Sequence, residues 1–438
     1  MNAALHRRHF LSATASAFGA LTLSGCMTRG SRLSDGTIYG PLVPDPDGLL
    51  DLPQGFTYRL ISSLGDAMDD GGSVPDKADG MGCLPGNPGE IVLIRNHELV
   101  PSDEGGAQLS IGYDKAAGRI VLPGGTTNIV LDAATLEKKR EFRSLAGTIR
   151  NCSGGITPWG SWLTCEEFVS EDRHIAPDKL GKSHGWVFEV PANATGQVNP
   201  EPLVHLGRFN HEAACVDARN GLIYLTEDRE DSLLYRFVRN GRLDEPGRLE
   251  AMVIEGVPDT RNWEEIAIRP HNWHAVSWVA LDDVASPNDD LRKRGAAMGA
   301  TVFARGEGIH MGDGELYICS TSGGAAKLGQ VFRLQPAFDG KPDRAALFFE
   351  SEDPSQFNYG DNLTVGPNGH LIVCEDQYTP VVDNRLIGIT PTGEPYTFGR
   401  LRLQTELAGG CFSPDGKWFF VNAYSPTRTV AITGPWAA

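Results

Sequence analysis

A short pattern of apolar positions recurs six times along the chain. Each copy begins at a glycine, continues as a brief apolar run and ends at a polar residue, as in Gly221-Leu-Ile-Tyr-Leu-Thr-Glu227. The six glycines are Gly89, Gly160, Gly221, Gly314, Gly369 and Gly416. A second short β-type segment precedes each glycine, across a turn rich in Pro, Asn, Asp and Gly. Because such turns join antiparallel strands, the pattern predicts six β-hairpins.

The spacing of the hairpins favours one repeat architecture. Successive glycines lie 71, 61, 93, 55 and 47 residues apart. A four-stranded propeller blade takes ~40–50 residues, so these intervals suit blades that carry insertions, the largest at roughly 240–300. We therefore predict an all-β fold, a six-bladed β-propeller with insertions and short helices over residues 51–438. The alternative is a β-sandwich or an irregular β protein. A strand near 56–61 would close the ring beside the last blade.

The N-terminal segment has the pattern of a targeting signal, so we do not expect it to be part of the fold. Arg7-Arg8-His9-Phe10-Leu11 is a twin-arginine motif, and Ser12 to Leu23 is too short and too rich in small residues for a membrane span. Leu23-Ser24-Gly25-Cys26 resembles a lipobox. We assign 1–26 to the signal and 27–50 to a linker, and expect export by the twin-arginine route to the periplasm or beyond. Two outcomes stay open there: a membrane tether through lipidated Cys26, or ordinary signal-peptidase cleavage.

The chain is strongly acidic, which limits the kinds of partner that it can bind. Its formal net charge is −17 at pH 7, with 56 Asp and Glu against 39 Lys and Arg. Nucleic acid is an unsuitable partner because phosphate neutralisation needs a basic surface. We expect an otherwise soluble monomer. Abundant carboxylates suit hard cations such as Ca²⁺.

The hairpin register gathers ligand-type residues at one face. Seven to ten residues before each turn glycine stand Asp79, Cys152, Glu212, Glu307, Asn362 and Glu406. The second strands end at Asn96-His97-Glu98, Glu166-Glu167, Glu227-Asp228, Ser320-Thr321, Glu375-Asp376 and Asn422. In a propeller both sets lie at the channel mouth opposite the hairpin turns. We therefore predict a metal site there, with Glu166 and Glu167 among its ligands.

Electrostatics supports metal ions at this mouth. Closely spaced carboxylates in a partly desolvated site repel one another by several kcal/mol. Either several of these carboxylates are protonated or cations hold them together, and multiple metal ions are the simpler explanation. Dense oxygen ligands favour Ca²⁺. The Cys152 thiolate suits a softer metal such as iron or zinc, so the residues point to a mixed cluster. The alternative is that acidic residues at blade ends cap strands or face solvent.

The hairpin register also indicates where the remaining cysteines, one arginine and two histidines lie. Among the remaining cysteines after Cys26, all except Cys152 fall at interior strand positions, where cysteine acts as a small buried hydrophobe. Arg305, two residues before Glu307, is a candidate clamp for an anionic substrate, with a structural salt bridge as the alternative. His97 and His211 flank candidate ligands and would orient a ligand, contact substrate or serve only in packing.

Several motifs resemble the PhoX-type alkaline phosphatase family. They are the twin-arginine motif, Arg95-Asn-His-Glu98, 151–167 (Asn-Cys-Ser-Gly-Gly through Cys-Glu-Glu), His184-Gly-Trp-Val-Phe-Glu189, Gly207-Arg-Phe-Asn-His-Glu212, Arg305-Gly-Glu307 and 409–416. The resemblance implies a six-bladed propeller with an iron–calcium cluster (Fe³⁺ and Ca²⁺) and a small phosphorylated substrate. It implies Cys152 as the bridging ligand and Arg305 as the phosphate contact. Further implied ligands are Glu212 and Glu307, with Glu166 or Glu167 and Glu406.

Three functions are thus open at this point. The first is phosphate monoester hydrolysis on a multinuclear metal cluster, with Arg305, Cys152 and His211 as the catalytic residues. The second is a calcium-dependent lactonase or esterase, which the two Asn-His-Glu sequences at 96–98 and 210–212 would also suit. The third is an exported propeller that binds a partner without catalysis.

Overall fold

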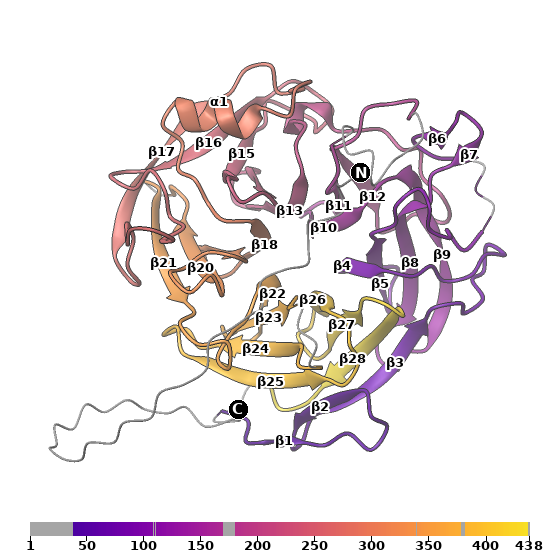
Figure 1. Cartoon of the computed structure of the whole chain (residues 1–438). Coiled ribbons are helices and arrows are strands. Elements are labelled where there is room, and N and C mark those ends of the chain that lie inside the picture. Colours follow the sequence, from indigo (N-terminus) through magenta and orange to yellow (C-terminus); the bar gives the residue numbers. More distant parts are fainter. Residues whose placement is uncertain are drawn as a thin grey trace, which may run out of the picture. The chain divides into compact units, whose positions relative to one another are not determined.

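The computed structural model describes residues 38–107, 109, 111–169, 180–338, 340–377 and 382–436. This part of the chain is almost entirely β (Figure 1), with one α-helix, α1 (Leu291–Ala297), and one 3₁₀ turn, η1 (Val204–Leu206), among its residues. No helix in the described ranges is long and apolar enough to cross a membrane. The twin-arginine motif and Cys26 lie outside the described residues.

The strands form five larger sheets in the described ranges, and each sheet is given in its spatial order. The first is β4 (Ala78–Pro85), β5 (Glu90–His97), β8 (Gly124–Asp132), β9 (Lys138–Thr148). The second is β10 (Asn151–Ile156), β11 (Ser161–Glu166), β12 (Val187–Pro191). The third is β13 (His211–Val216), β14 (Ile223–Glu227), β15 (Tyr235–Val238), β16 (Arg248–Ile254), β17 (Trp273–Ala280), β21 (Arg344–Glu350), β20 (Gln330–Gln335), β19 (Leu316–Ser320), β18 (Gly306–Met311). The fourth is β1 (Leu42–Val43), β2 (Leu50–Pro53), β25 (Pro395–Leu401), β24 (Arg385–Ile389), β23 (Leu371–Glu375), β22 (Gly360–Val365). The fifth is β26 (Leu407–Phe412), β27 (Phe419–Ala423), β28 (Arg428–Thr433), β3 (Thr57–Ser63), and β6 (Lys115–Ala116) pairs separately with β7 (Ile120–Val121).

All six predicted hairpins are confirmed. They are β4–β5, β10–β11, β13–β14, β18–β19, β22–β23 and β26–β27, each antiparallel. Each turn glycine has a positive φ, between 71° at Gly416 and 88° at Gly160. Glycine populates this left-handed region without the Cβ clash that other residues incur. The repeated glycine therefore marks the turn because of its backbone conformation.

The first strands of the six hairpins lie side by side in a propeller-like arrangement (Figure 1). Each of β4, β10, β13, β18, β22 and β26 contacts the next, and β26 contacts β4 again. The predicted closing strand is confirmed, because β3 pairs with β28 from Thr57↔Thr433 to Ser63↔Arg428. The N-terminal and C-terminal parts of the described fold are thereby joined in one sheet.

The prediction of six separate blades is wrong. In the part of the chain that the structure describes, four sheets of three to six strands accompany one nine-stranded sheet. This sheet forms because the long insertion before β18 contributes β17, whose Trp273 to Ala275 pair with Ala346 to Arg344 of β21. Two of the six hairpins therefore share one sheet. Strands β1 and β2 also extend the fourth sheet, so it takes in part of the segment predicted as a linker.

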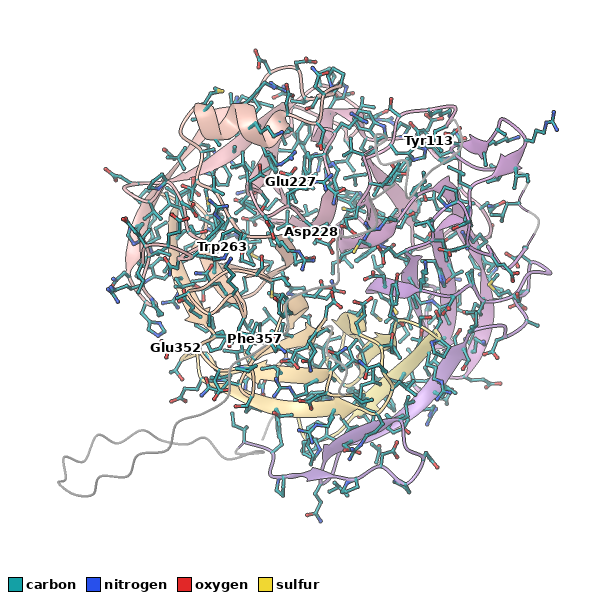
Figure 2. The ribbon with its side chains drawn as sticks, in the orientation of Figure 1. Tyr113, Glu227, Asp228, Trp263, Glu352 and Phe357 are labelled. Atoms are coloured by element: carbon teal, nitrogen blue, oxygen red, sulfur yellow. The ribbon has the colours of Figure 1, made fainter. Side chains whose placement is uncertain are left out.

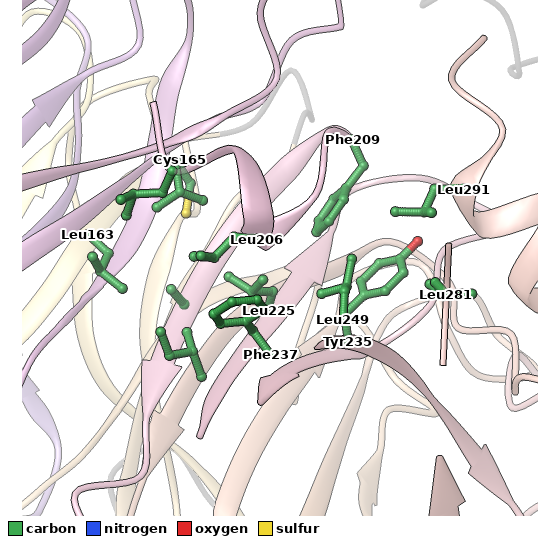
Figure 3. Packing of buried hydrophobic residues seen from close by; sticks show 14 of the residues in the cluster. Leu163, Cys165, Leu206, Phe209, Leu225, Tyr235, Phe237, Leu249, Leu281 and Leu291 are labelled. Carbon is green, nitrogen blue, oxygen red and sulfur yellow. The ribbon is translucent and has the colours of Figure 1, made fainter. Parts of the chain in front are cut away.

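Hydrophobic packing between neighbouring sheets supports the ring. In one cluster, Leu163 and Cys165 of β11 face Leu225, Tyr235, Phe237 and Leu249 of the next sheet, and Leu291 of α1 lies against its outer side (Figure 3). Cys165 is fully buried there, and all seven described cysteines are buried free thiols. Interior cysteines thus behave as small core residues, as predicted.

A largely apolar cavity of about 740 Å³ lies among the first strands, on the side of the hairpin turns. Its walls include Leu84, Trp162, Ile309, Val365 and Phe412. Titratable groups gather elsewhere, at the opposite ends of these strands.

Candidate metal centre at the strand ends

Each of the six hairpins carries a β-bulge at the same place. His211 pairs with Glu227, yet Ala214 pairs with Leu225, so the first strand holds one extra residue. The other five hairpins show the same register shift near the start of the first strand. A bulge re-aims side chains relative to the regular pleat and is common beside functional sites.

The bulges place ligand-type side chains in a ring. The residues at the first bulge position are Asp79, Cys152, Glu212, Glu307, Asp361 and Gly409. The residue that follows is small in most cases, because neighbouring first strands approach closely at this level. A Cβ on Gly308, for example, would lie 2.7 Å from the backbone nitrogen of Leu363. Close strand packing therefore brings the bulge side chains together.

A second set of residues joins them through a repeated backbone hydrogen bond. The residue after each second strand donates its N–H to the carbonyl of the residue before the first strand, at 2.9–3.2 Å. The donors are Glu98, Glu167, Asp228, Thr321, Asp376 and Tyr424, and the acceptors are Lys77, Arg150, Asn210, Arg305, Tyr359 and Glu406. Three positions per hairpin thus meet at one end of the first strands.

Carboxylates and one thiol from these positions form overlapping groups of metal-ligand type. The groups are Glu98–Cys152–Glu167, Asp79–Glu98–Glu406, Glu212–Glu307–Asp361 and Asp361–Asp376–Glu406, and within each the ligand atoms lie within 4.8 Å of one another. Glu98, Asp361 and Glu406 each belong to two groups, so the four groups are continuous. We call these nine residues the acidic cluster.

Glu212 and Asp79 of the acidic cluster carry buried carboxyl oxygens that have no hydrogen-bond partner among the described residues. Glu212 is fully buried, and neither of its carboxylate oxygens has a hydrogen-bond donor among the described residues. Asp79 Oδ1 is likewise unpartnered within the described ranges, while the Cys152 thiol lies 3.6 Å from Asp79 Oδ2. Native folds rarely leave such groups unsatisfied, because each costs about 1–3 kcal/mol or more when charged. The residues therefore fit a bound cation.

Burial governs the ionisation of the cluster when no cation is bound. It raises the pKa of Glu167 to about 8 and that of Asp361 to about 8, with neighbouring carboxylates adding to the effect at Asp361. Burial and the charge of Glu307 hold the pKa of Glu212 well above its usual range. Burial, reinforced by Asp79, does the same for the Cys152 thiol. Only a nearby positive charge would make these groups good anionic ligands at neutral pH.

Arg305 lies at the rim of the acidic cluster. Its Nε and Nη2 donate to the Asp228 carboxylate at 2.7 and 3.0 Å, and Nη2 also donates to Glu307 Oε1 at 2.7 Å. Burial alone would raise the pKa of Asp228, but the Arg305 charge lowers it. Figure 2 shows Asp228 on the inner side of the ring, beside Glu227 at the end of β14. Arg305 therefore forms the salt bridge considered above and also faces the metal-ligand groups.

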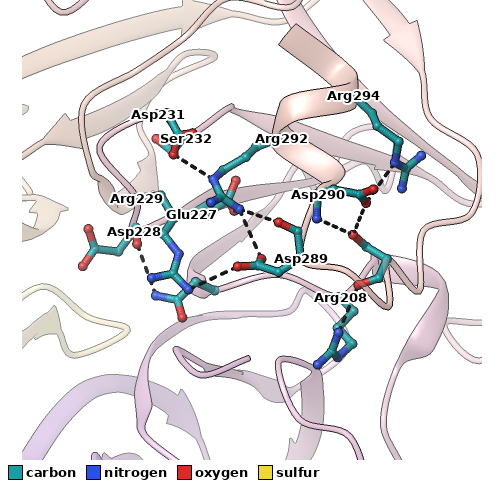
Figure 4. A network of polar contacts seen from close by, with 12 residues as sticks. Arg208, Glu227, Asp228, Arg229, Asp231, Ser232, Asp289, Asp290, Arg292 and Arg294 are labelled. Atoms are coloured by element: carbon teal, nitrogen blue, oxygen red, sulfur yellow. Dashed lines mark hydrogen bonds and ion pairs between the residues drawn. The ribbon is translucent and has the colours of Figure 1, made fainter. Parts of the chain in front are cut away.

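Ion pairs from the insertion that carries α1 stabilise this end of β14 (Figure 4). Arg292 donates to Asp231 at 2.7 Å and to Asp289 at 3.2 Å, and lies 3.8 Å from Glu227. Arg229 and Asp289 are 3.6 Å apart. These ion pairs fix the segment from which Asp228 reaches Arg305.

The structure brings together six of the eight predicted metal ligands: Asp79, Cys152, Glu167, Glu212, Glu307 and Glu406. Asn362 lies one residue past Asp361, donating to its Oδ1 at 2.9 Å and accepting from the Gly409 N–H. Glu166 lies outside the acidic cluster. Its oxygens accept from the N–H groups of Ile149 and Gly185 at 3.0 and 2.9 Å and contact His184 Nδ1 at 2.6 Å.

The two flanking histidines also point away from the acidic cluster. His211 stacks on Phe209 at 3.6 Å, and its Nε2 contacts the Gly207 carbonyl oxygen at 2.9 Å. Burial lowers the pKa of His211 to about 3, so the imidazole is neutral at physiological pH. His97 is held between the Asp76 carbonyl oxygen and Thr127 Oγ1. Both residues pack within their sheets, and neither belongs to a metal-ligand group of the described chain.

Four residues of this site were not among the predicted site residues: Glu98, Arg150, Asp361 and Asp376. Glu98 and Asp376 stand at second-strand ends that the sequence pattern did locate. Asp361 needed the bulge register, which moves the ligand position by one residue from Asn362. Arg150 donates from Nε to Glu98 Oε1 at 2.5 Å and from Nη2 to Glu167. Its position directly before a first strand, equivalent to that of Arg305, would have been the available signal.

Comparisons with known proteins show a family match and a shared fold. A family model described as "Alkaline phosphatase PhoX" matches residues 37–131 and 115–427. A solved structure of Pseudomonas fluorescens PhoX in complex with vanadate, a transition state analogue, is 20% identical with a TM-score of 0.69, covering 88% of this chain and 96% of that chain. A gluconolactonase from Xanthomonas campestris is 13% identical with a TM-score of 0.41, over 90% and 98%. No curated protein matches the chain. The likeness to the Pseudomonas structure shows a shared fold.

Proposed function

The chain belongs to the PhoX alkaline phosphatase family, a family of phosphoric monoester hydrolases, and we propose that it hydrolyses phosphate monoesters at the acidic cluster, on calcium and iron ions. The observation that carries this proposal is the fully buried Glu212, whose oxygens have no hydrogen-bond donor among the described residues. A hydrolase that works through cations needs such carboxylates as metal ligands. A site that served only for packing would contain apolar side chains instead.

The donor sets suggest which residues hold which ion. Glu212, Glu307 and Asp361 offer oxygen alone, which suits Ca²⁺. Glu98, Cys152 and Glu167 add sulfur, which suits the softer iron. Bound metal ions would polarise the phosphoryl oxygens and supply an activated oxygen nucleophile.

Arg305 would hold the substrate phosphate. Asp228 binds its Nε and Nη2 in a two-pronged contact, which fixes the plane of the guanidinium. Nη1 makes no hydrogen bond within the described part of the chain, so it can donate to a phosphate oxygen. As negative charge develops on the transferring group, a fixed guanidinium stabilises it without reorganisation. No histidine is needed as an acid or base in this scheme, in keeping with the packing of His211.

The proposed setting follows the sequence. A twin-arginine signal would export the chain after folding, with its metals loaded, to the periplasm or beyond. A small phosphorylated molecule would be the substrate there, and lipidated Cys26 would tether the enzyme to a membrane.

Turnover of para-nitrophenyl phosphate by metal-loaded protein tests the proposal. We expect Cys152→Ala and Glu212→Gln to lower kcat at least ~100-fold and to reduce bound metal, since each removes a ligand. Cys165→Ala is the matched control, because it removes a buried thiol from the hydrophobic core instead. Wild-type rates in both cluster variants, with metal content unchanged, would show that the acidic cluster is not the active site.

A further inference from the structure

Arg150 and Arg305 occupy the same position on two different hairpins. Each stands directly before a first strand and two residues before the bulge residue, Cys152 or Glu307. Both adopt a left-handed backbone, with φ of 49° and 53°. Residues other than glycine rarely adopt this region, so the surrounding fold imposes the geometry. The two arginines are therefore structurally equivalent.

Their guanidinium groups are also held in the same way. Arg150 binds Glu98 and Glu167 through Nε and Nη2, as Arg305 binds Asp228 and Glu307. The two side chains are 20% and 25% exposed, whereas the carboxylates they hold are largely buried. Nη1 of Arg150, like that of Arg305, has no hydrogen-bond partner in the described ranges. Each arginine thus keeps two N–H protons at the rim of the acidic cluster.

One polar chain links the two arginines around the rim. Asn210 Nδ2 donates to Glu167 Oε1, which belongs to the carboxylate that Arg150 binds, at 3.1 Å. The same Nδ2 donates to the backbone carbonyl oxygen of Asp228, whose side chain Arg305 binds, at 3.2 Å. The hairpin β13–β14 lies between the two arginines, and its bulge residue is Glu212. The arginines therefore flank the residue whose unpartnered carboxylate carries the proposed function.

We propose that Arg150 is a second residue that binds the phosphate group of the substrate, together with Arg305. The inference rests on the proposed function. A dianionic phosphate monoester offers three terminal oxygens, and guanidinium groups match phosphate oxygens in geometry and charge. Phosphate monoesters, which carry two negative charges, would gain more from the pair of arginines than phosphate diesters with one.

The test compares Arg150→Met, Arg305→Met and Lys77→Met in metal-loaded protein. Lys77 stands at the equivalent position of a third hairpin, with φ of 54°, but its Nζ binds Asp103 at 2.6 Å. We expect Arg150→Met to weaken the binding of inorganic phosphate, measured by calorimetry, by ~10-fold or more, and Arg305→Met to do the same. KM for para-nitrophenyl phosphate should rise similarly while bound metal stays at the wild-type level. Arg150→Lys should restore part of the affinity, and Lys77→Met should change it less than ~2-fold.

Each outcome bears on one hypothesis. If Arg150→Met binds phosphate as tightly as Lys77→Met does, or weakens only in proportion to metal lost, Arg150 has a structural role and the inference is wrong. If wild-type protein binds phosphate through Arg150 and yet hydrolyses no monoester, the inference survives and the proposed function does not. Calorimetry of phosphate binding needs no turnover, so the two failures are distinguishable.

Discussion

Glu166 and Glu167 are neighbours on the chain with opposite surroundings. Glu167 extends into the acidic cluster, while Glu166 accepts backbone N–H groups and contacts His184. Successive side chains at a strand end point to opposite sides, and the sequence alone offered no reason to choose between the two. The pair with His184 makes Glu166 a structural anchor between two segments of one sheet.

His184 should make stability pH-dependent. Burial opposes its protonation, but the charge of Glu166 and the contact with Asp114 raise the pKa of His184 to about 9. A raised folded pKa gives stability that is fully present below the unfolded value of 6.5 and lost as pH rises through about 9. The corresponding loss is about 3 kcal/mol.

Denaturant unfolding between pH 6 and 10 measures this loss. Wild-type protein should lose stability relative to His184→Gln across that window, at equal metal load in both samples. Parallel pH curves for the two proteins would mean that His184 is not charged in the folded state.

At the scale of elements, hairpins were predictable and bulges were not. Turn glycines and apolar runs are local signals, and each correctly marked a hairpin. A bulge depends on which residues pair across two strands, and no local signal in this chain reveals it. The prediction therefore selected Asn362, one residue past Asp361. The shared nine-stranded sheet was missed for a similar reason, because β17 pairs with a strand more than sixty residues away.

The close approach of first strands at the bulges gives a sharp test. A Cβ on Gly308 would lie 2.7 Å from Leu363 N and 2.8 Å from Asn362 Cα, both backbone atoms that cannot turn aside. Gly308→Ala should therefore cost about 1–3 kcal/mol and separate Glu307 from Asp361, so that the protein binds less calcium.

Gly369→Ala is the matched control for that change. Gly369 is a turn glycine with φ of 78° and no atom nearer than Pro391 Cγ at 3.8 Å. Its replacement should cost about 1–2 kcal/mol through backbone strain while metal content stays constant. Thermal unfolding and elemental analysis of both variants separate the effects. Equal metal content in the two variants would count against the role given to the bulges.

At the scale of the whole fold, the acidic cluster connects hairpins that are distant in sequence. Its ligands come from residue 79 to residue 406, and β3 joins β28 to link the two ends of the ring. Without cations, buried carboxylates from several first strands face one another and repel. Bound ions would neutralise these carboxylates and connect the strands through shared coordination. The free energy of unfolding should therefore depend on metal as well as on core packing.

Removing the metal should therefore weaken the entire fold. A ligand present at 100 times its dissociation constant adds about 2.7 kcal/mol to the folded state, so for a fold of this size chelation should lower Tm by about 3 °C or more. Calcium added back in excess should recover most of that loss if the oxygen-only groups hold it. Cys152→Ala, which lacks the thiolate but keeps those groups, should retain the calcium-dependent part of the shift and lose only the part due to iron. A Tm that is the same with and without chelator would mean that the unpartnered carboxylates are tolerated without cations, and the metal centre proposed here would then have no support from stability.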